Sequence, residues 1–302
     1  MTAEHRGEHA TIDGTVSEGG VTVVQNADQR GLAAAAAREL VRTVTKIQRE
    51  QSGVHGDGVA RIVLTGGGAG IQTLRELAVL DHAATTAAED FPIDAIDWSR
   101  VLIFFGDERF VPAGDSERNE KQARDALLDH IAIPAENIVS YLAPTGAGPS
   151  DGAELDEAAR DYEENLARLA PQGFDVHLLG MGPEGHINSL FPHTPELLEA
   201  TGEVVAVRDC PKPPPERVSL TINAVNRAAQ VWLLVSGAEK AEAAEQVANG
   251  GNGAQWPGAI VAGVERTVLW VDEAASPWLA AGASDTATVA ATEDAENAEN
   301  EV

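Results

Sequence analysis

Cysteine is almost absent from this sequence of 302 residues: Cys210 is the only one. No disulfide can form within the chain, and a lone thiol is typical of a reducing compartment, so we expect a cytoplasmic protein. No apolar run approaches the roughly 20 residues that a membrane-spanning helix needs. The N-terminal residues also lack a signal-peptide pattern. We therefore expect no membrane partner.

Positive charge is also scarce, with 21 lysines and arginines against 48 aspartates and glutamates and a net charge of −27. Such a chain lacks the broad basic surface that nucleic acid requires, so we expect no nucleic-acid partner. Residues 285–302 hold six acids and no lysine or arginine. We expect a disordered tail at residues 1–19 and an acidic disordered tail at 281–302, on either side of one domain at 20–280.

Between the tails, short runs of β-branched and aliphatic residues are typical of buried strands. The clearest is VLIFF at Val101–Phe105, which is apolar throughout, as expected of a strand covered on both faces of a sheet. The same reasoning predicts six strands, at residues 21–25, 61–65, 101–105, 174–179, 231–236 and 267–271.

Helical periodicity lies between these runs. The clearest example is at residues 156–169, where apolar residues recur every three or four positions: Leu155, Ala159, Tyr162, Leu166 and Leu169. Further helices are expected after Asp28, after residues 66–70, and at residues 119–131 and 238–248.

The alternation of strand and helix over about 250 residues predicts the fold class. We expect a single α/β domain with a doubly wound, mainly parallel, Rossmann-like sheet and helices on both faces. Residues 81–150 are a candidate for a small subdomain.

Four polar or glycine-rich clusters directly follow predicted strands. Open α/β sheets bind ligands outside the carboxyl ends of their strands, so four clusters at such ends indicate one shared pocket. The clusters are GGGAG at 66–70, GDER at 106–109, GMGPEGH at 180–186 and SGAEK at 236–240.

The glycines Gly66, Gly67 and Gly68 stand where a strand leads into a helix. Backbone N–H groups at such a turn can converge on an anion, helped by the helix N-terminus. A nucleotide P-loop is excluded because no Lys-Ser/Thr pair follows. The natural anion is then the phosphate of a sugar; the alternative is an ordinary tight turn.

Charged residues near the other clusters each have two interpretations. Arg217 and Lys240 could hold phosphate, since an arginine fork grips two oxygens and a lysine adds a point charge, or they could be ordinary surface residues. In GDER, Asp107 could form the pocket floor with Arg109 ordering it or touching substrate hydroxyls. The alternative is a solvated loop with a local ion pair.

The stretch GMGPEGH matches G-x-G-x-x-G after a strand, but no periodic helix follows to bind a pyrophosphate, so a dinucleotide site is excluded. The G-x-S-x-G nucleophile motif is absent, and the histidines and Cys210 show no metal-ligand spacing. What remains is His186, held by glycines, with Glu184 two residues before it. A carboxylate near an imidazole fixes its tautomer and stabilises the imidazolium, so His186 is a candidate general base.

These residues, in this order, resemble the 6-phosphogluconolactonase family over residues 21–271. The segment LGMGPEGHINSLFP carries most of the resemblance, and the segments FFGDERFVP, SERN, RVSLT and SGAEK match further motifs of the family. The resemblance implies a cytoplasmic enzyme that needs no cofactor or metal and hydrolyses 6-phospho-D-glucono-1,5-lactone in the pentose phosphate pathway.

The same resemblance assigns roles to individual residues. His186 would be the general base, with Glu184 and Asp107 as its catalytic partners. The 6-phosphate would be held by Gly66, Gly67, Gly68, Arg217 and Lys240. The sugar end of the pocket would be lined by Asp107, Arg109 and Asn119. Two positions depart from the family, which usually has aspartate in place of Glu184 and a small residue in place of Asn188.

Two other functions stay open. Glucosamine-6-phosphate deaminases are a sister family with the same phosphate loop and the tripeptide GHI, which they follow with a further acidic residue. This chain has no acid from Ile187 to Thr194, which favours lactone hydrolysis. A non-catalytic sugar-phosphate sensor would need the phosphate grip but no base, and His186 argues against it. No sequence feature fixes the oligomeric state, and a monomer is the expectation.

Overall fold

The computed structural model describes residues 15–16, 20–86, 94–146 and 152–279. Most of the two expected tails, residues 1–14, 17–19 and 281–302, therefore lies outside the described residues. Within the expected N-terminal tail, Thr15–Val16 forms strand β1, which pairs antiparallel with the next strand. Among the described residues, no helix is both long and apolar enough to cross a membrane.

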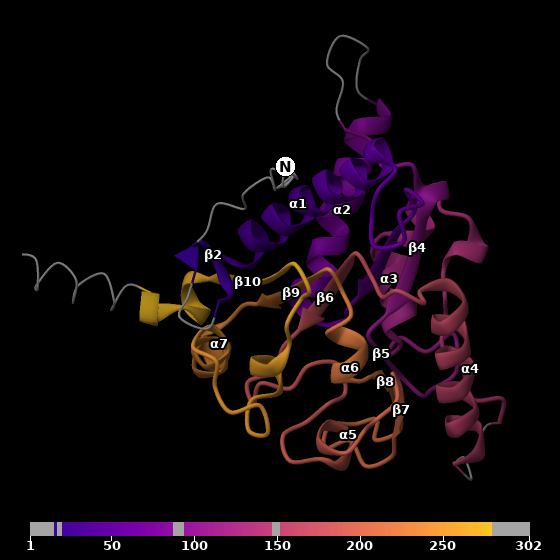
Figure 1. Ribbon diagram of the computed structural model, residues 1–302, viewed down its shortest axis with the longest axis vertical. Helices are drawn as coiled ribbons and strands as arrows, with labels where there is room; N and C mark the ends of the chain where they lie inside the picture. The colour runs from indigo at the N-terminus through magenta and orange to yellow at the C-terminus, as the bar shows by residue number, and fades with distance from the viewer. Residues whose placement is uncertain (1–14, 17–19, 87–93, 147–151, 280–302) are drawn as a thin grey trace, which may run out of the picture.

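The core of the molecule is a seven-stranded sheet in the order β1-β2-β10-β9-β6-β3-β4 (Figure 1). All its pairings except β1 with β2 are parallel, which confirms the predicted doubly wound α/β class. The six predicted strands are present within two residues of their expected ends: β2 Thr22–Asn26, β3 Ala60–Leu64, β4 Val101–Phe105, β6 Val176–Gly180, β9 Gln230–Val235 and β10 Arg266–Asp272.

The strand order reverses between β3 and β6. From β3 the chain passes to β4 on one side, whereas from β6 it passes to β9 and β10 on the other. Pairing between β3 and β6 stops at Val63 and His177. Beyond that point Thr65 Oγ1 accepts a hydrogen bond of 2.9 Å from the N–H of Gly180, which joins the two carboxyl ends. Ligands of doubly wound sheets bind at such a switch point.

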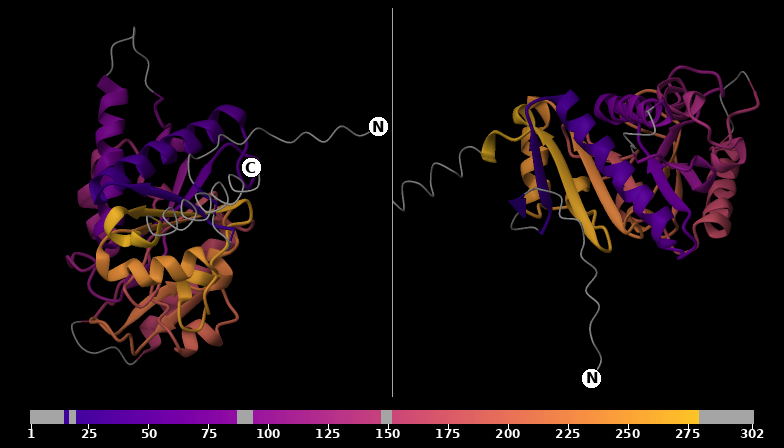
Figure 2. Two further views of the ribbon diagram at one scale, coloured as in Figure 1. Left: turned by 90° about the vertical axis from the view of Figure 1, so that its left-hand side faces the viewer. Right: turned by 90° about the horizontal axis from the view of Figure 1, so that it is seen from above.

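Helices cover both faces of the sheet. α1 (Gln29–Glu50) and α2 (Gly67–Thr86) lie on one face and α7 (Ala241–Ala248) on the other (Figure 2). α1 begins at the expected residue because the Asp28 side chain caps it, accepting a hydrogen bond of 2.7 Å from the N–H of Gly31. Its apolar face is buried against the sheet.

Two predicted helices are shorter than expected. α3 spans only Asn119–Ala126 and is followed by a 3₁₀ turn at Leu128–His130. The predicted helix at 238–248 starts with a 3₁₀ turn at Ala238–Lys240, and α7 begins at Ala241. α4 (Ala153–Leu169) is close to its expected bounds, and α5 (Pro195–Leu198) and α6 (Ile222–Val225) are single turns.

A second sheet was not predicted from the sequence. It is antiparallel, in the order β5-β8-β7, with β5 at Asp107–Arg109, β8 at Arg217–Leu220 and β7 at Val204–Val207. Residues 81–150, the candidate subdomain, contribute β4 to the large sheet and β5 to the small one. The pairing of β5 with β8 sets Arg109 opposite Arg217 and Asp107 opposite Ser219, and so assembles residues from distant parts of the chain.

Candidate active site

A cavity of about 270 Å³ opens at the switch point between β3 and β6. Nine of the ten predicted site residues line it, and the tenth, Glu184, contacts the ring nitrogen Nδ1 of His186. The four sequence clusters therefore do meet, as predicted. The nine are Gly66, Gly67, Gly68, Asp107, Arg109, Asn119, His186, Arg217 and Lys240.

A second cavity, of about 320 Å³, lies beside α1 and holds none of these residues. Its Arg266 is engaged by neighbouring side chains: Nη2 lies 3.1 Å from Glu39 Oε1, and Nε donates to Gln230 Oε1 at 2.8 Å. The cavity at the switch point is the candidate site because the polar groups predicted from the sequence converge there.

The glycine turn after β3 opens onto the cavity. Gly67 has φ of +79°, which favours glycine, and α2 begins at this residue. A Cβ on Gly66 would lie only 2.2 Å from Oδ1 of Asn119, so this position also requires glycine. Because the first N–H groups of a helix have no partner within the helix, the start of α2 is suited to bind an anion.

His186 is fixed by a tight loop. The N–H of Gly182 donates to the carbonyl of His186 at 3.0 Å, and a Cβ on Gly182 would lie 2.1 Å from the ring nitrogen Nδ1. On its other side the imidazole stacks on Phe191, with ring centroids 4.2 Å apart. The plane of the ring is therefore held by its neighbours, and 17% of the side chain is exposed.

Charged neighbours determine the protonation of His186. Nδ1 lies 3.2 Å from Glu184 Oε2, while Glu184 Oε1 lies 2.8 Å from Nζ of Lys212. Burial, and then the charge of Lys212, lower the pKa of His186, although Glu184 and Asp107 act in the opposite direction. Burial would raise the pKa of Glu184, but contacts with Lys212 and His186 outweigh it and hold that pKa at about 2. At neutral pH the pair is a carboxylate beside a neutral imidazole.

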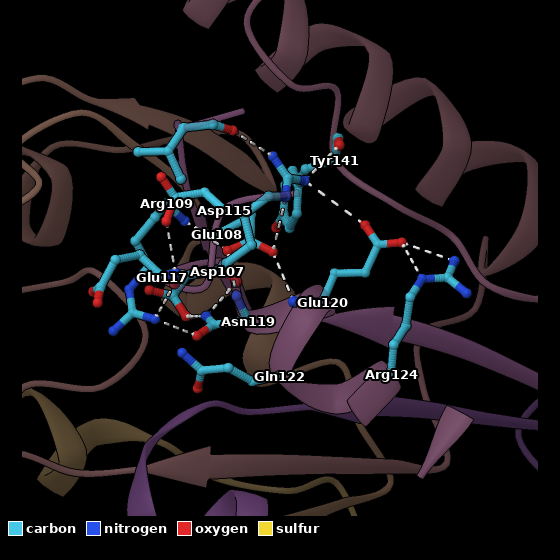
Figure 3. A network of polar contacts seen from close by, with 12 residues as sticks. Asp107, Glu108, Arg109, Asp115, Glu117, Asn119, Glu120, Gln122, Arg124 and Tyr141 are labelled. Atoms are coloured by element: carbon cyan, nitrogen blue, oxygen red, sulfur yellow. Dashed lines mark hydrogen bonds and ion pairs between the residues drawn. The ribbon is translucent and has the colours of Figure 1, made fainter. Parts of the chain in front are cut away.

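Asp107 lies buried at the cavity floor, 6% exposed. Its Oδ2 accepts a hydrogen bond of 2.6 Å from Ser189 Oγ, and its Oδ1 accepts one of 2.9 Å from Asn119 Nδ2. Arg109 Nη1 donates to Asn119 Oδ1 at 2.8 Å (Figure 3). The solvated-loop interpretation of GDER is wrong, because this segment is strand β5 with two buried carboxyl groups.

Glu108, the next residue of β5, connects this strand to α3 and is 1% exposed. Its carboxylate accepts hydrogen bonds from the backbone N–H groups of Arg109, Asn119 and Glu120 at 2.7–2.9 Å (Figure 3). Arg118 Nε lies 3.7 Å away. Burial outweighs these contacts and raises the pKa of Glu108 to about 7. Glu108 thus positions two residues that line the cavity.

The two predicted phosphate-binding cations are placed differently. Arg217 is 5% exposed, and its guanidinium donates to the backbone carbonyls of Lys212, Pro213 and Pro214 at 2.9–3.3 Å. Its Nη1 lies 3.5 Å from Ser189 Oγ and 3.9 Å from Asp107 Oδ2. Most of its donors are therefore engaged by the protein. Lys240 ends a 3₁₀ turn at the cavity, and burial lowers its pKa.

Residues 27–270 match the family model described as glucosamine-6-phosphate isomerases/6-phosphogluconolactonase. The chain belongs to this family. Among curated family members, a 6-phosphogluconolactonase of Mycobacterium leprae is 47% identical over 254 residues, which cover 82% of this chain and 94% of that protein. One from Mycobacterium tuberculosis is 46% identical over 250 residues, 81% of this chain and 93% of that protein.

A solved 6-phosphogluconolactonase of Trypanosoma brucei has the same fold as this chain. It superimposes with a TM-score of 0.67 at 25% identity and covers 84% of this chain and 97% of that one.

One charged residue of the candidate site in this chain was not predicted from the sequence. Lys212 lines the cavity and contacts Glu184, although only its neighbour Arg217 was predicted from the segment PKPPPERVSLT. The lysine beside three prolines was the available signal. Asn188 also lines the cavity, with φ of +47°, and a Cβ on Gly106 would lie 2.3 Å from its Oδ1. Within the described chain, no three His, Cys, Asp or Glu side chains are grouped to hold a metal ion.

Proposed function

We propose that this chain is a hydrolase that converts 6-phospho-D-glucono-1,5-lactone to 6-phospho-D-gluconate in the oxidative branch of the pentose phosphate pathway. One observation carries the proposal: His186 and the glycine turn at the start of α2 line the same cavity. A base and an anion site are thus placed to act on two ends of one sugar phosphate. The family membership and the relatives' names support this substrate class.

In the proposed mechanism a water molecule attacks C1 of the lactone. Because Nδ1 of His186 faces Glu184, Nε2 is the nitrogen left to take the proton from that water. The carboxylate of Glu184 stabilises the imidazolium that forms. As the tetrahedral intermediate collapses, the bond between C1 and the ring oxygen breaks and the imidazolium returns its proton to that oxygen. A positioned base of this kind contributes about 10²–10⁴-fold to the rate.

Phosphate binding would orient the lactone for this attack. We assign the phosphate to the N-terminus of α2, at Gly66, Gly67 and Gly68, together with the ammonium group of Lys240. Arg217 would support the phosphate end of the cavity by donating hydrogen bonds to the backbone of the neighbouring loop. Asp107, Arg109 and Asn119 would face the sugar hydroxyls. Orientation of a reactive ester by its phosphate can supply much of the remaining rate.

The test is a lactone-hydrolysis assay corrected for spontaneous ring opening, with the wild type and His186→Ala. The variant is expected to lose most of the turnover and keep binding of 6-phosphogluconate, since the imidazole contributes to chemistry more than to affinity. Near-full turnover in His186→Ala would remove the catalytic assignment. Ammonia release from glucosamine 6-phosphate would indicate a deaminase instead. Thermal stabilisation by sugar phosphates without any turnover would indicate a sensor.

The place of action is part of the proposal. The reaction uses a sugar phosphate, and the single cysteine of the sequence suits a reducing environment, so we assign the enzyme to the cytoplasm.

A further inference from the structure

Lys212 belongs to a loop that the protein holds firmly at the cavity. The buried Arg217 donates from Nη2 to the carbonyl of Lys212 at 2.9 Å and from Nε to that of Pro214 at 3.1 Å. The backbone at the lysine and directly after it is thereby held, while 45% of its side chain is exposed. The ammonium group is presented to the site by the fold.

The side chain of Lys212 closes a ring of contacts around His186. Nζ lies 2.8 Å from Glu184 Oε1, and the other oxygen of that carboxylate lies 3.2 Å from Nδ1 of His186. Nζ is also 5.6 Å from the ring centroid of Phe191, on which His186 stacks. One carboxylate therefore bridges the ammonium group and the imidazole.

We propose that Lys212 is a positioning residue of this active site, which holds the Glu184 carboxylate against His186 and opposes protonation of the imidazole. The inference rests on the function proposed above, in which neutral His186 takes a proton from water. It assigns Lys212 a role that acts through its neighbours and requires no contact with the reacting atoms.

The charges that face His186 determine the direction of the effect. Glu184 and Asp107 favour the imidazolium, whereas Lys212 opposes it, and burial of the ring acts in the same direction as Lys212. Arg217 and Lys240 line the same cavity. Without the ammonium group, one opposing charge is lost and the Glu184 carboxylate is no longer shared. Both changes raise the pKa of His186, so less of the base is neutral at a given acidic pH.

The experiment compares Lys212→Met with the wild type over a pH series. In the variant we expect the acid limb of kcat/KM to move upward by about one pH unit, the lower end of the shift that a neighbouring charge produces. Above that limb, kcat should return close to the wild-type value. Lys212→Arg, which keeps the charge, should restore the wild-type limb. Lys46→Met, on α1 and outside this cavity, is the matched control and should leave the profile unchanged.

A second measurement does not depend on turnover. Titration of the histidine signals by NMR, with His186 assigned from the signal missing in His186→Ala, should show a higher pKa in Lys212→Met and in Lys212→Gln. Unchanged titration would overturn the inference even if the enzyme were inactive on the lactone. An unmoved acid limb with KM raised at every pH would also overturn it, and would identify Lys212 as a ligand of the substrate phosphate. Absence of lactone hydrolysis in the wild type would instead contradict the proposed function.

Discussion

A Cβ on Gly66 would lie 2.2 Å from Oδ1 of Asn119, so the glycine turn after β3 and the first residue of α3 are in direct contact. The amide of Asn119 is held in turn by Asp107 and Arg109. The proposed phosphate site and the proposed sugar site are therefore mechanically connected. A change on one side of this contact displaces the other.

Replacing Gly66 by alanine should impair both stability and activity. The added methyl group must push Asn119 away, and an overpacked contact of this kind costs about 1–3 kcal/mol. The melting temperature and kcat/KM would both be lower than in the wild type. Gly114→Ala is the control, because a Cβ there meets nothing within 4 Å. Equal behaviour of the two variants would show that the contact with Asn119 is unimportant.

The pH dependence of stability should report on Glu108. Its pKa rises from an ordinary value of 4.5 to about 7 in the folded protein, mainly through burial. The folded state thus binds a proton between these pH values that the unfolded state has released. The contribution of this group is fully present below about pH 4.5 and is lost as the pH rises through about 7.

The variant Glu108→Gln removes this titration. Relative to the wild type, its free energy of unfolding should rise as the pH increases from 4.5 to 7, by about 1.4 kcal/mol for each unit of pKa shift. Denaturant unfolding of both proteins at several pH values measures the difference, and the other carboxyl groups cancel in the comparison. Glu136→Gln, at an exposed site, is the control. Parallel curves for Glu108→Gln and the wild type would contradict this assignment.

Much of the large sheet could be predicted because β3, β4, β6, β9 and β10 are buried over most of their length. Runs such as Val101–Phe105 are apolar throughout, and this pattern needs no knowledge of partners. The end of each strand could then be placed within two residues. The meeting of Gly66, Asp107, His186 and Lys240 could be predicted from their positions just past predicted strands, because the carboxyl ends of parallel strands share one edge.

The small antiparallel sheet could not be predicted in the same way. β5 has three residues and β8 has four, too few for an alternating pattern to stand out. The register that sets Asp107 opposite Ser219 depends on a partner more than 100 positions away. The burial of Glu108 depends on that pairing. From the sequence alone, its carboxyl group would be predicted to be exposed to solvent.

The contact of Lys212 with Glu184 depends on loop conformation. The prolines at 213–215 indicate a stiff segment, but its position follows from three carbonyls that accept from Arg217. Arg217 itself was predicted as a phosphate ligand, and no sequence pattern indicates that its donors are engaged by its own loop.

Deletion of residues 281–302 should leave turnover unchanged. Among the described residues, all those that line the candidate cavity lie between Thr65 and Lys240, and the last strand, β10, ends at Asp272. Steady-state kinetics of the truncated and full-length chains, measured at equal concentration, make the comparison. A large loss of kcat/KM on truncation would mean that the acidic segment takes part in catalysis.

Replacing Arg217 by alanine separates a phosphate ligand from a residue that holds a loop. The guanidinium donates to three backbone carbonyls and lies 3.9 Å from Asp107, so its loss removes the donor that these carbonyls share. Charged hydrogen bonds of this kind contribute about 1.5–3 kcal/mol each. We therefore expect a lower melting temperature together with a lower kcat/KM, because Arg217 lines the cavity and holds the loop beside it. Arg217→Lys should not restore either quantity, since one ammonium group cannot reach three carbonyls in the geometry of the fork. A variant with unchanged melting temperature and only a raised KM would show that Arg217 acts on the phosphate alone.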